Sequence, residues 1–261
     1  MRNSAIRGEY ILQELMRAGS VEVEALARSL GVDSSTIRRD LERLERQQVL
    51  RRVHGGAIPL EAPADAVYAY DLNFQDNLGR QMPEKLQIAQ AALKLIRPGD
   101  TISISPGTTT TYLARAIRQS PIPNLTIVTN AVNIAMELSG IPQVTLVLTG
   151  GMILPSFFAL VGPMAEQNLR ELHTDKAFVG MHGVSSSYGL TGPNQLEALT
   201  YRAAMERTRE TIVLADQTKI GQVALYRIAP ITTMRRLLTA HGADAGELEQ
   251  MRTLGIIVVE C

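Results

Sequence analysis

The chain has 261 residues, of which 45% are hydrophobic and 20% charged, a composition typical of a folded globular protein that excludes wholesale disorder. Basic and acidic residues number 26 each, so no overall positive charge indicates a nucleic-acid partner. The single cysteine, Cys261, excludes a disulfide framework and a cysteine-based zinc site. The four histidines show no metal-ligand spacing, so we expect neither a metal nor a cofactor. The N-terminal residues lack the apolar run of a signal peptide, so we expect a cytoplasmic protein without a membrane segment.

Basic residues are nevertheless concentrated near the N-terminus. The first 60 residues contain ten arginines and no lysine, and six of these arginines lie between Arg38 and Arg52. Arginine presents a planar fork that suits phosphate groups and guanine edges. A solvated helix with Glu–Arg pairs, such as Glu42 and Arg46 at i,i+4 spacing, is the alternative interpretation that charge alone leaves open.

Two helices are predicted before residue 31. Apolar residues recur at helical spacing between Ile6 and Leu15, and a second, shorter helix is expected over residues 22–30. Gly31-Val32 then supplies a tight turn.

A third helix is predicted after Asp33, whose carboxylate can accept hydrogen bonds from the free amides of the first turn. Ile37, Leu41 and Leu44 lie at i, i+4 and i+7, so they bury one face of this helix. Short hydroxyl side chains and paired arginines occupy the remaining surface, as a helix that enters the major groove requires. The β-prone, basic segment 49–53 and the glycines after it predict a wing that lies on the DNA backbone.

This pattern resembles the winged helix-turn-helix of DeoR-family bacterial transcription regulators. The resemblance rests on Val32-Asp33-Ser34-Ser35-Thr36-Ile37-Arg38-Arg39-Asp40-Leu41 and on Arg52-Val53-His54-Gly55-Gly56-Ala57. The expected partner is double-stranded operator DNA, and the alternative is a winged helix used for protein contacts. The candidate DNA-binding residues are Ser34, Ser35, Thr36, Arg38, Arg39, Arg43, Arg51, Arg52 and His54.

Residues 1–57 are thus expected to form the DNA-binding domain, residues 58–80 a linker, and residues 81–261 a larger domain in which strands and helices alternate. Such alternation predicts an α/β fold with a mostly parallel sheet and helices on both faces. The uncharged stretch 138–165 is broken by glycine and proline too often for a membrane span, and we expect a buried strand with glycine-rich turns there. The expected elements are a helix over 85–95, a strand over 101–105, a helix over 108–117, a strand over 125–129, a helix opened by Asn130, and strands over 144–148, 177–179, 211–214, 237–238 and 256–259.

Polar residues follow several of these strands, where ligands bind in parallel α/β sheets. The run Gly107 to Thr110 begins a helix, so its hydroxyls and free amides can form an anion nest. Thr129-Asn130, Gly150-Gly151 and the segment Asp216 to Lys219 follow three other strands.

The larger domain resembles the DeoR-family effector domain, which is similar in fold to ribose-5-phosphate isomerase and glucosamine-phosphate deaminase. The residues that carry this resemblance are Gly99-Asp100-Thr101-Ile102, Gly107-Thr108-Thr109-Thr110, Val128-Thr129-Asn130, Gly150-Gly151, Gly162-Pro163, Gly189-Leu190-Thr191, Asn194, Glu197-Ala198 and Leu214-Ala215-Asp216-Gln217-Thr218-Lys219-Ile220-Gly221. The resemblance implies a sensor for a phosphorylated sugar or related metabolite, without turnover, and places Asn130, Asn194 and Glu197 toward sugar hydroxyls. Ser105 and His182 stand where the family usually has Asp, which weakens both the enzyme interpretation and any inference about the ligand.

The effector-binding candidates come from these strand ends and family positions. They are Ser105, Gly107, Thr108, Thr109, Thr110, Thr129, Asn130, Gly150, Gly151, His182, Asn194, Glu197, Asp216 and Lys219.

The leading hypothesis is a metabolite-responsive transcription regulator, a repressor of sugar metabolism rather than an activator, that works as a homo-oligomer (a dimer or tetramer). No residue is expected to be catalytic. The alternative is a sugar-phosphate isomerase or deaminase with an accessory DNA-binding domain, although an enzyme has no need of residues 1–57.

Overall fold

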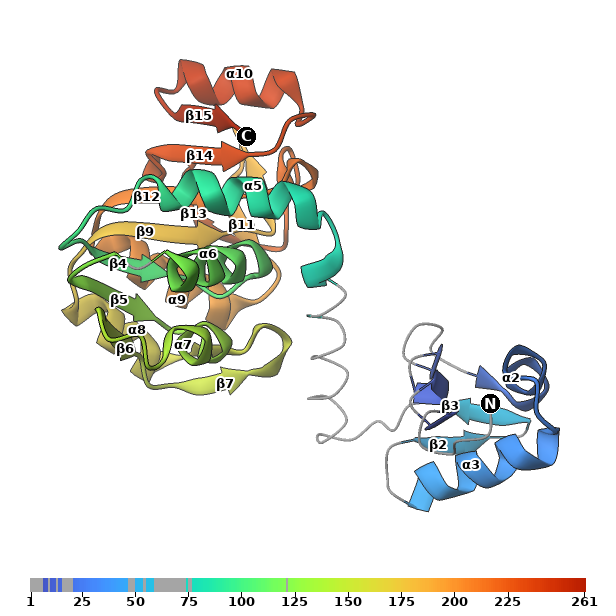
Figure 1. Ribbon diagram of the computed structural model, residues 1–261. Helices are drawn as coiled ribbons and strands as arrows, with labels where there is room; N and C mark the ends of the chain where they lie inside the picture. Colours follow the sequence, from blue (N-terminus) through green and yellow to red (C-terminus); the bar gives the residue numbers. More distant parts are fainter. Residues whose placement is uncertain are drawn as a thin grey trace. The chain divides into compact units, whose positions relative to one another are not determined.

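The computed structural model describes residues 7, 8, 10–12, 14, 15, 21–46, 50–53, 55–58, 74, 77–120 and 122–261. The chain divides into two compact units, Met1–Asn73 and Phe74–Cys261 (Figure 1). Within the described ranges, no helix combines the length and hydropathy that crossing a membrane requires.

The first unit is a small winged helix-turn-helix. Its sheet is antiparallel in the order β1-β3-β2. The predicted tight turn before α3 is present. Gly31 has φ +62°, and its amide donates to the Ala27 carbonyl and so ends the preceding helix. Ile37 and Leu41 are fully buried against the other helices, which confirms the predicted apolar face. The described elements are β1 (Val21–Glu22), α2 (Val23–Leu30), α3 (Ser34–Arg46), β2 (Arg51–Val53) and β3 (Gly56–Ile58).

Gly55 and Gly56 of the wing are each required for a different structural reason. Gly55 adopts φ +80° in the turn between β2 and β3, a conformation that favours glycine. Gly56 pairs with Glu22 in the ladder, and a Cβ atom there would collide with the backbone carbonyl of Val21. The double glycine therefore permits both the tight turn and the close approach of β1.

The second unit is built on a seven-stranded parallel sheet in the order β15-β14-β12-β9-β4-β5-β6. These strands are β4 (Thr101–Ile104), β5 (Leu125–Thr129), β6 (Val144–Leu148), β9 (Thr174–Gly180), β12 (Thr208–Leu214), β14 (Arg236–Thr239) and β15 (Ile257–Glu260). The helices of this unit are α5 (Met82–Leu93), α6 (Thr108–Gln119), α7 (Val132–Leu138), α8 (Pro163–Glu171), α9 (Gln195–Glu206) and α10 (Ala245–Thr253).

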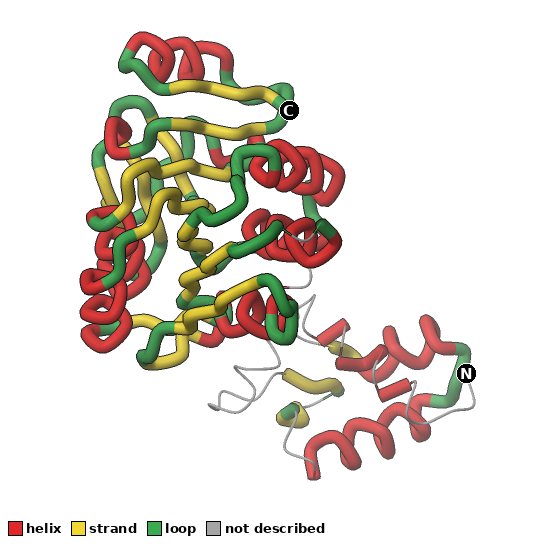
Figure 2. The backbone as a smooth tube through the Cα atoms, turned by 60° about the vertical axis from the view of Figure 1, so that its left-hand side comes forward, coloured by secondary structure: helices red, strands yellow, loops and turns green. Residues whose placement is uncertain are grey.

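Helices cover both faces of this sheet, and the strand sequences are apolar on both faces for that reason. Along β9, Phe178 joins the core formed with α5, α6 and α7, whereas its neighbours Ala177 and Val179 join the core formed with α9 and α10. Figure 2 shows the strands of this unit lying between two layers of helices. The expected mostly parallel α/β fold is confirmed.

Two antiparallel additions complete the second unit. One is the three-stranded sheet of β10 (Gly183–Ser185), β11 (Gly189–Gly192) and β13 (Tyr226–Ala229), and the other is the hairpin of β7 (Met152–Leu154) and β8 (Ala159–Val161). The stretch 138–165 contains three strands: β6 is the half-exposed edge strand of the main sheet, with Leu148 43% exposed, whereas Ala159 and Val161 of β8 are buried as expected. The helix expected from Asn130 begins two residues later, at Val132.

The second unit begins earlier than residue 81. Phe74 and Leu78 are buried in its core, and the ring of Phe74 meets that of Phe158 edge-on at 5.3 Å between centroids. The end of the expected linker therefore packs as part of this unit, while residues 59–73 lie outside the described residues.

Candidate functional site

The surface of α3 that the core does not cover carries the predicted DNA-binding side chains. Arg38, Arg39 and Ser35 are exposed, whereas Ser34 and Thr36 are half-buried at the start of the helix. Among the described residues, Arg38 makes one ionic contact, a long one with Glu24 at 3.9 Å between charged atoms that are both well exposed to solvent. Such a pair contributes little to stability and leaves the guanidinium available to a partner.

One arginine of the wing, Arg52, joins the wing to the helix. Arg52 pairs with Glu42 at 2.9 Å, and its backbone amide donates to Glu45 at 2.9 Å. The carboxylate of Glu42 thus pairs with Arg52, whereas the Arg46 side chain donates to the backbone carbonyl of Glu42 at 3.3 Å. Arg43 lies 3.5 Å from Asp40 on the same helix. Arg51 is exposed on β2, and His54 lies outside the described residues.

A cavity of about 590 Å³ lies at the carboxyl ends of the central strands of the second unit. The chain runs from β4 outward through β5 to β6, and from β9 outward through β12 to β15, so the order of the sheet reverses between β4 and β9. A crevice outside the carboxyl ends at such a reversal is the usual ligand site of open α/β sheets. The loops after β4, β9 and β12 line it here.

Half of the fourteen predicted effector residues meet in this cavity, although they come from four separate parts of the chain. They are Gly107, Thr108, Thr109, His182, Glu197, Asp216 and Lys219.

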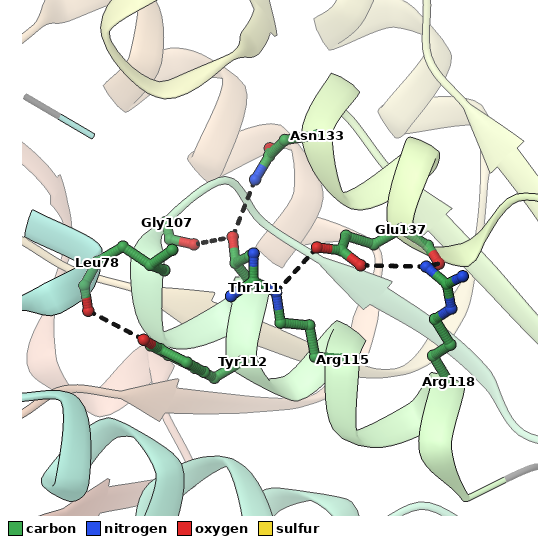
Figure 3. Close-up of polar contacts among 8 residues, drawn as sticks. All are labelled: Leu78, Gly107, Thr111, Tyr112, Arg115, Arg118, Asn133 and Glu137. Carbon is green, nitrogen blue, oxygen red and sulfur yellow. Dashed lines mark hydrogen bonds and ion pairs between the residues drawn. The ribbon is translucent and has the colours of Figure 1, made fainter. Parts of the chain in front are cut away.

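The first turn of α6 presents its amides to the cavity. Thr110 donates its hydroxyl proton to the Gly107 carbonyl at 2.9 Å. Thr111 donates to the same carbonyl at 2.7 Å, and Asn133 donates to Thr111 (Figure 3). No side chain of the described residues caps this helix, and no acidic residue lies in its first turn. Thr108 and Thr109 therefore face the cavity beside free amides, where the helix dipole favours an anion.

Ser105, Thr110 and Asn194 shape the cavity without lining it. The Ser105 hydroxyl accepts the Gly180 amide and donates to the Pro106 carbonyl, both at 3.0 Å, so it fixes the loop after β4 against the end of β9. Asn194 is the N-cap of α9, and its side-chain oxygen accepts the amides of Leu196 and Glu197.

Thr129, Asn130, Gly150 and Gly151 lie at the carboxyl ends of β5 and β6, away from the reversal. Thr129 donates to the Ile104 carbonyl at 2.7 Å, and Asn130 donates to the Leu160 carbonyl at 2.9 Å. The Gly150 amide donates to Asn168. These groups hold neighbouring segments together, and none of them lines the cavity.

Charged groups of both signs line the cavity. Asp216 is 3% exposed and accepts the amide and hydroxyl of Thr218, which fixes the loop that carries Lys219. Burial lowers the pKa of His182 to about 4, with a smaller effect from Lys219, so the imidazole is neutral at pH 7. Its ring meets that of Phe157 edge-on at 5.0 Å. His182 therefore offers a neutral polar edge rather than a charge.

Glu197 is the most unusual group of the cavity. It is 2% exposed, and neither carboxylate oxygen has a hydrogen-bond partner among the residues that the structure describes. The spacing Asn194 to Glu197 is that of a capping box, yet only the asparagine half forms. Burial raises the pKa of Glu197 to about 7. Burial of the Tyr201 hydroxyl, together with the charge of the nearby Glu197, raises the pKa of Tyr201.

Sequence analysis missed a whole wall of the cavity. The missed residues include Asn77, Arg80, Gln81, Lys85, Phe157 and Tyr201. One signal existed, because Lys85 falls on the apolar stripe of α5 with Ile88, Ala89 and Ala92. A lysine at a buried helical position needs polar partners and so indicates a site. No cluster of possible metal ligands occurs in the described part of the chain.

Comparison with known families agrees with both units. The model described as the DeoR C terminal sensor domain matches residues 80–241, and that of the DeoR-like helix-turn-helix domain matches residues 7–62. The protein is thus a two-part transcription regulator, with a DNA-binding unit and a sensor unit, rather than an enzyme. It belongs to the DeoR family.

Similar regulators align along almost the whole chain. The uncharacterized HTH-type transcriptional regulator YulB of Bacillus subtilis is 31% identical over 95% of this chain and 93% of its own length. The putative aga operon transcriptional repressor of Escherichia coli O157:H7 is 31% identical over 97% and 92%. The lactose phosphotransferase system repressor of Staphylococcus epidermidis is 31% identical over 95% of each. Among solved structures, ribose 5-phosphate isomerase A of Methanocaldococcus jannaschii is 21% identical over 52% of this chain and 53% of its own, with a TM-score of 0.38.

Proposed function

We propose that this regulator represses an operon of sugar metabolism and releases its operator when a phosphorylated sugar binds the cavity of the sensor unit. The observation that carries the proposal is the meeting, in one cavity, of the uncapped first turn of α6, the ammonium of Lys219 and the unpartnered carboxylate of Glu197. The printed names of two relatives, an aga operon repressor and a lactose system repressor, support a sugar operon.

The two kinds of group suit the two ends of a phosphorylated sugar. A phosphate fits the amides of Gly107 to Thr109, with Lys219 as a point charge beside it. Within the described part of the chain the oxygens of Glu197 accept no hydrogen bond, and sugar hydroxyls can supply the missing donors. Asn130 and Asn194, which the family resemblance also placed toward hydroxyls, have their side chains engaged within the protein.

In the DNA-binding unit, we assign α3 to the major groove and the wing of β2 and β3 to the DNA backbone. Arg38 and Arg39 are the exposed basic side chains of the first half of α3, so we expect one to contact a base edge and the other mainly a phosphate. Because operator DNA lies in the cytoplasm of a bacterium, the proposal places the protein there.

We further propose a homo-oligomer, because one winged helix reads few base pairs and two-fold dimers bind half-sites about 34 Å apart or a multiple of that distance. Exposed apolar side chains around the β7 hairpin and α8 support a contact through the sensor unit, since Met152 and Met164 are 59% and 62% exposed. Light scattering at micromolar concentration tests this, and a monomer that still binds operator tightly contradicts it.

Thermal-shift measurement with a panel of sugar phosphates tests the effector site. We expect at least one compound to raise the melting temperature of the wild type, and Thr109→Val and Lys219→Ala to reduce that shift. Thr145→Val is a matched control, because Thr145 lies exposed on the edge strand β6 and does not line the cavity. If a compound stabilises the wild type and both cavity variants equally, the phosphate site is wrong.

A further inference from the structure

Among the described strands, β15 and β6 form the two edges of the main sheet (Figure 1). Exposed edge strands commonly carry charged residues, which prevent pairing with another chain. On β15, the carboxylate of Glu260 binds Arg252 at 2.7 Å. β6 carries neither a charged residue nor a proline, and the sequence has no charge at all between residues 138 and 165. β6 is therefore the edge at which another strand can add to the sheet.

Half of the backbone groups of β6 point away from the sheet. The Gln143 carbonyl accepts a hydrogen bond from β5 at 3.3 Å, and the Thr149 amide donates one to β5 at 3.0 Å. Because backbone groups alternate along a strand, the odd-numbered residues from 143 to 149 face β5. Leu146 and Leu148 thus present their amides and carbonyls to the open side.

Exposed apolar side chains surround this edge. Two of them flank it from opposite faces of the sheet, because α7 packs in the core with α5 and α6, whereas α8 packs in the cluster with α9. Two more are neighbours on β7, where successive side chains point to opposite sides. The five residues, which we call the edge patch, are Met136 of α7 (73% exposed), Leu148 of β6 (43%), Met152 and Ile153 of β7 (59% and 52%) and Met164 of α8 (62%).

The edge patch is large enough for a stable protein contact. A fully exposed apolar residue of this size presents about 200 Å², so the patch amounts to roughly 550 Å². A homodimer interface of standard size buries about 800 Å² per partner, roughly 65% of it apolar, which is about 520 Å². The patch thus supplies about the apolar area that one dimer contact needs.

We propose that the edge patch is covered by a second copy of this chain, with the two β6 strands paired antiparallel about a two-fold axis beside Leu146. This rests on the proposed function in one respect, that the regulator is a homo-oligomer. A two-fold axis perpendicular to the sheet pairs two identical edges antiparallel, so each copy meets the same surface of the other. In this register Leu146 faces Leu146 of the other copy, Val144 faces Leu148, and the outward amides and carbonyls are satisfied. The pairing occupies both β6 edges, so it closes at two copies.

Sedimentation equilibrium of the full-length protein tests the interface. Leu148→Lys places a charge on the open edge, and because Leu148 is already exposed in the single chain, the core stays intact. Val259→Lys is the matched control, since Val259 is 37% exposed on β15, the opposite edge. We expect Leu148→Lys to raise the dissociation constant of the dimer at least about ten-fold and Val259→Lys to leave it unchanged. An unchanged constant in Leu148→Lys, or equal weakening by both variants, overturns the interface.

Disulfide cross-linking tests the register, with Cys261→Ser as the background. Leu146→Cys brings the new thiol to its copy across the axis, with Cα atoms about 5.5 Å apart, which a disulfide can span. An added oxidant should therefore link most of the chains in pairs. Thr145→Cys, whose side chain lies on the other face and opposes residue 147, should cross-link at least about ten-fold less. Equal cross-linking at both positions overturns the register.

The outcomes separate this inference from the function on which it rests. If the wild type is a monomer, the homo-oligomer and the β6 interface both fail. If the wild type is an oligomer that Leu148→Lys does not weaken, the β6 interface fails and the homo-oligomer stands. No residue of the edge patch lines the effector cavity, so the melting-temperature shifts with sugar phosphates decide that site independently.

Discussion

Replacing Glu197 by Gln should stabilise the protein in the absence of effector, and only at neutral and alkaline pH. The carboxyl group is 2% exposed and unpartnered among the described residues, and burial raises its pKa from 4.5 to about 7. Below pH 4.5 the folded and unfolded chains both carry the proton, so burial costs nothing. Between pH 4.5 and 7 only the folded chain retains it, so stability falls as the pH rises, and the loss is complete above pH 7. At about 1.4 kcal/mol per pH unit, the full penalty is about 3 kcal/mol.

Glutamine has the same shape and no charge, so Glu197→Gln should recover most of this free energy at pH 8 and almost none at pH 4. For a unit of this size, the recovery corresponds to a rise in melting temperature of roughly 6–12 °C. Differential scanning calorimetry across this pH range is the assay. Glu206→Gln, on the exposed last turn of the same helix, should change stability by less than about 0.5 kcal/mol at either pH. If Glu197→Gln is no more stable than the wild type at pH 8, the carboxylate is not a desolvated, unpartnered charge.

Three further changes test other parts of the account. Arg38→Ala and Arg39→Ala should each weaken operator binding. One should cost about 1–3 kcal/mol of binding free energy and relax the sequence preference, and the other should reduce the slope of log affinity against log salt concentration by about 1. Gel shifts on operator and random DNA at two salt concentrations measure both effects, and unchanged affinity in both variants removes α3 from the interface. Asp40→Ala should destabilise the DNA-binding unit by about 3–5 kcal/mol, since Arg7 lies buried 2.7 Å from that carboxylate; an unchanged urea midpoint would contradict this. Phe178→Ala should cost about 3–5 kcal/mol in a thermal melt, because this ring is fully buried at the centre of the sheet, and a loss below about 1 kcal/mol would show that the core collapses around the gap.

Local signals were enough to predict the DNA-binding unit. The spacing of Ile37, Leu41 and Leu44 fixes which face of α3 is buried and therefore which face carries Arg38 and Arg39. The wing followed from two glycines and a basic, β-prone segment. What the sequence could not show is that Arg52 is engaged by Glu42 of α3, because the choice among several nearby carboxylates depends on the three-dimensional approach of the wing.

The cavity was only half predictable, for a reason that lies in the sheet. Strand ends can be recognised from apolar runs followed by polar residues, but their order in the sheet cannot. Gly107 and Asp216 follow strands near the reversal and meet, whereas Asn130 and Gly150 follow β5 and β6 on the other side. The wall that includes Lys85 comes from a segment that was expected to be linker and the helix after it, and nothing local shows that this segment crosses the carboxyl ends of the strands.

The measurement that tests the central claim most directly is operator binding by the full-length protein, followed by fluorescence anisotropy during titration with the sugar phosphates of the thermal-shift panel. The account predicts that at least one phosphorylated sugar releases the wild type from operator DNA. It also predicts that Lys219→Ala binds the same DNA with unchanged affinity and is released only at a much higher concentration of that sugar. If no phosphorylated sugar alters operator affinity, or if Lys219→Ala responds as the wild type does, the cavity is not the site that controls DNA binding.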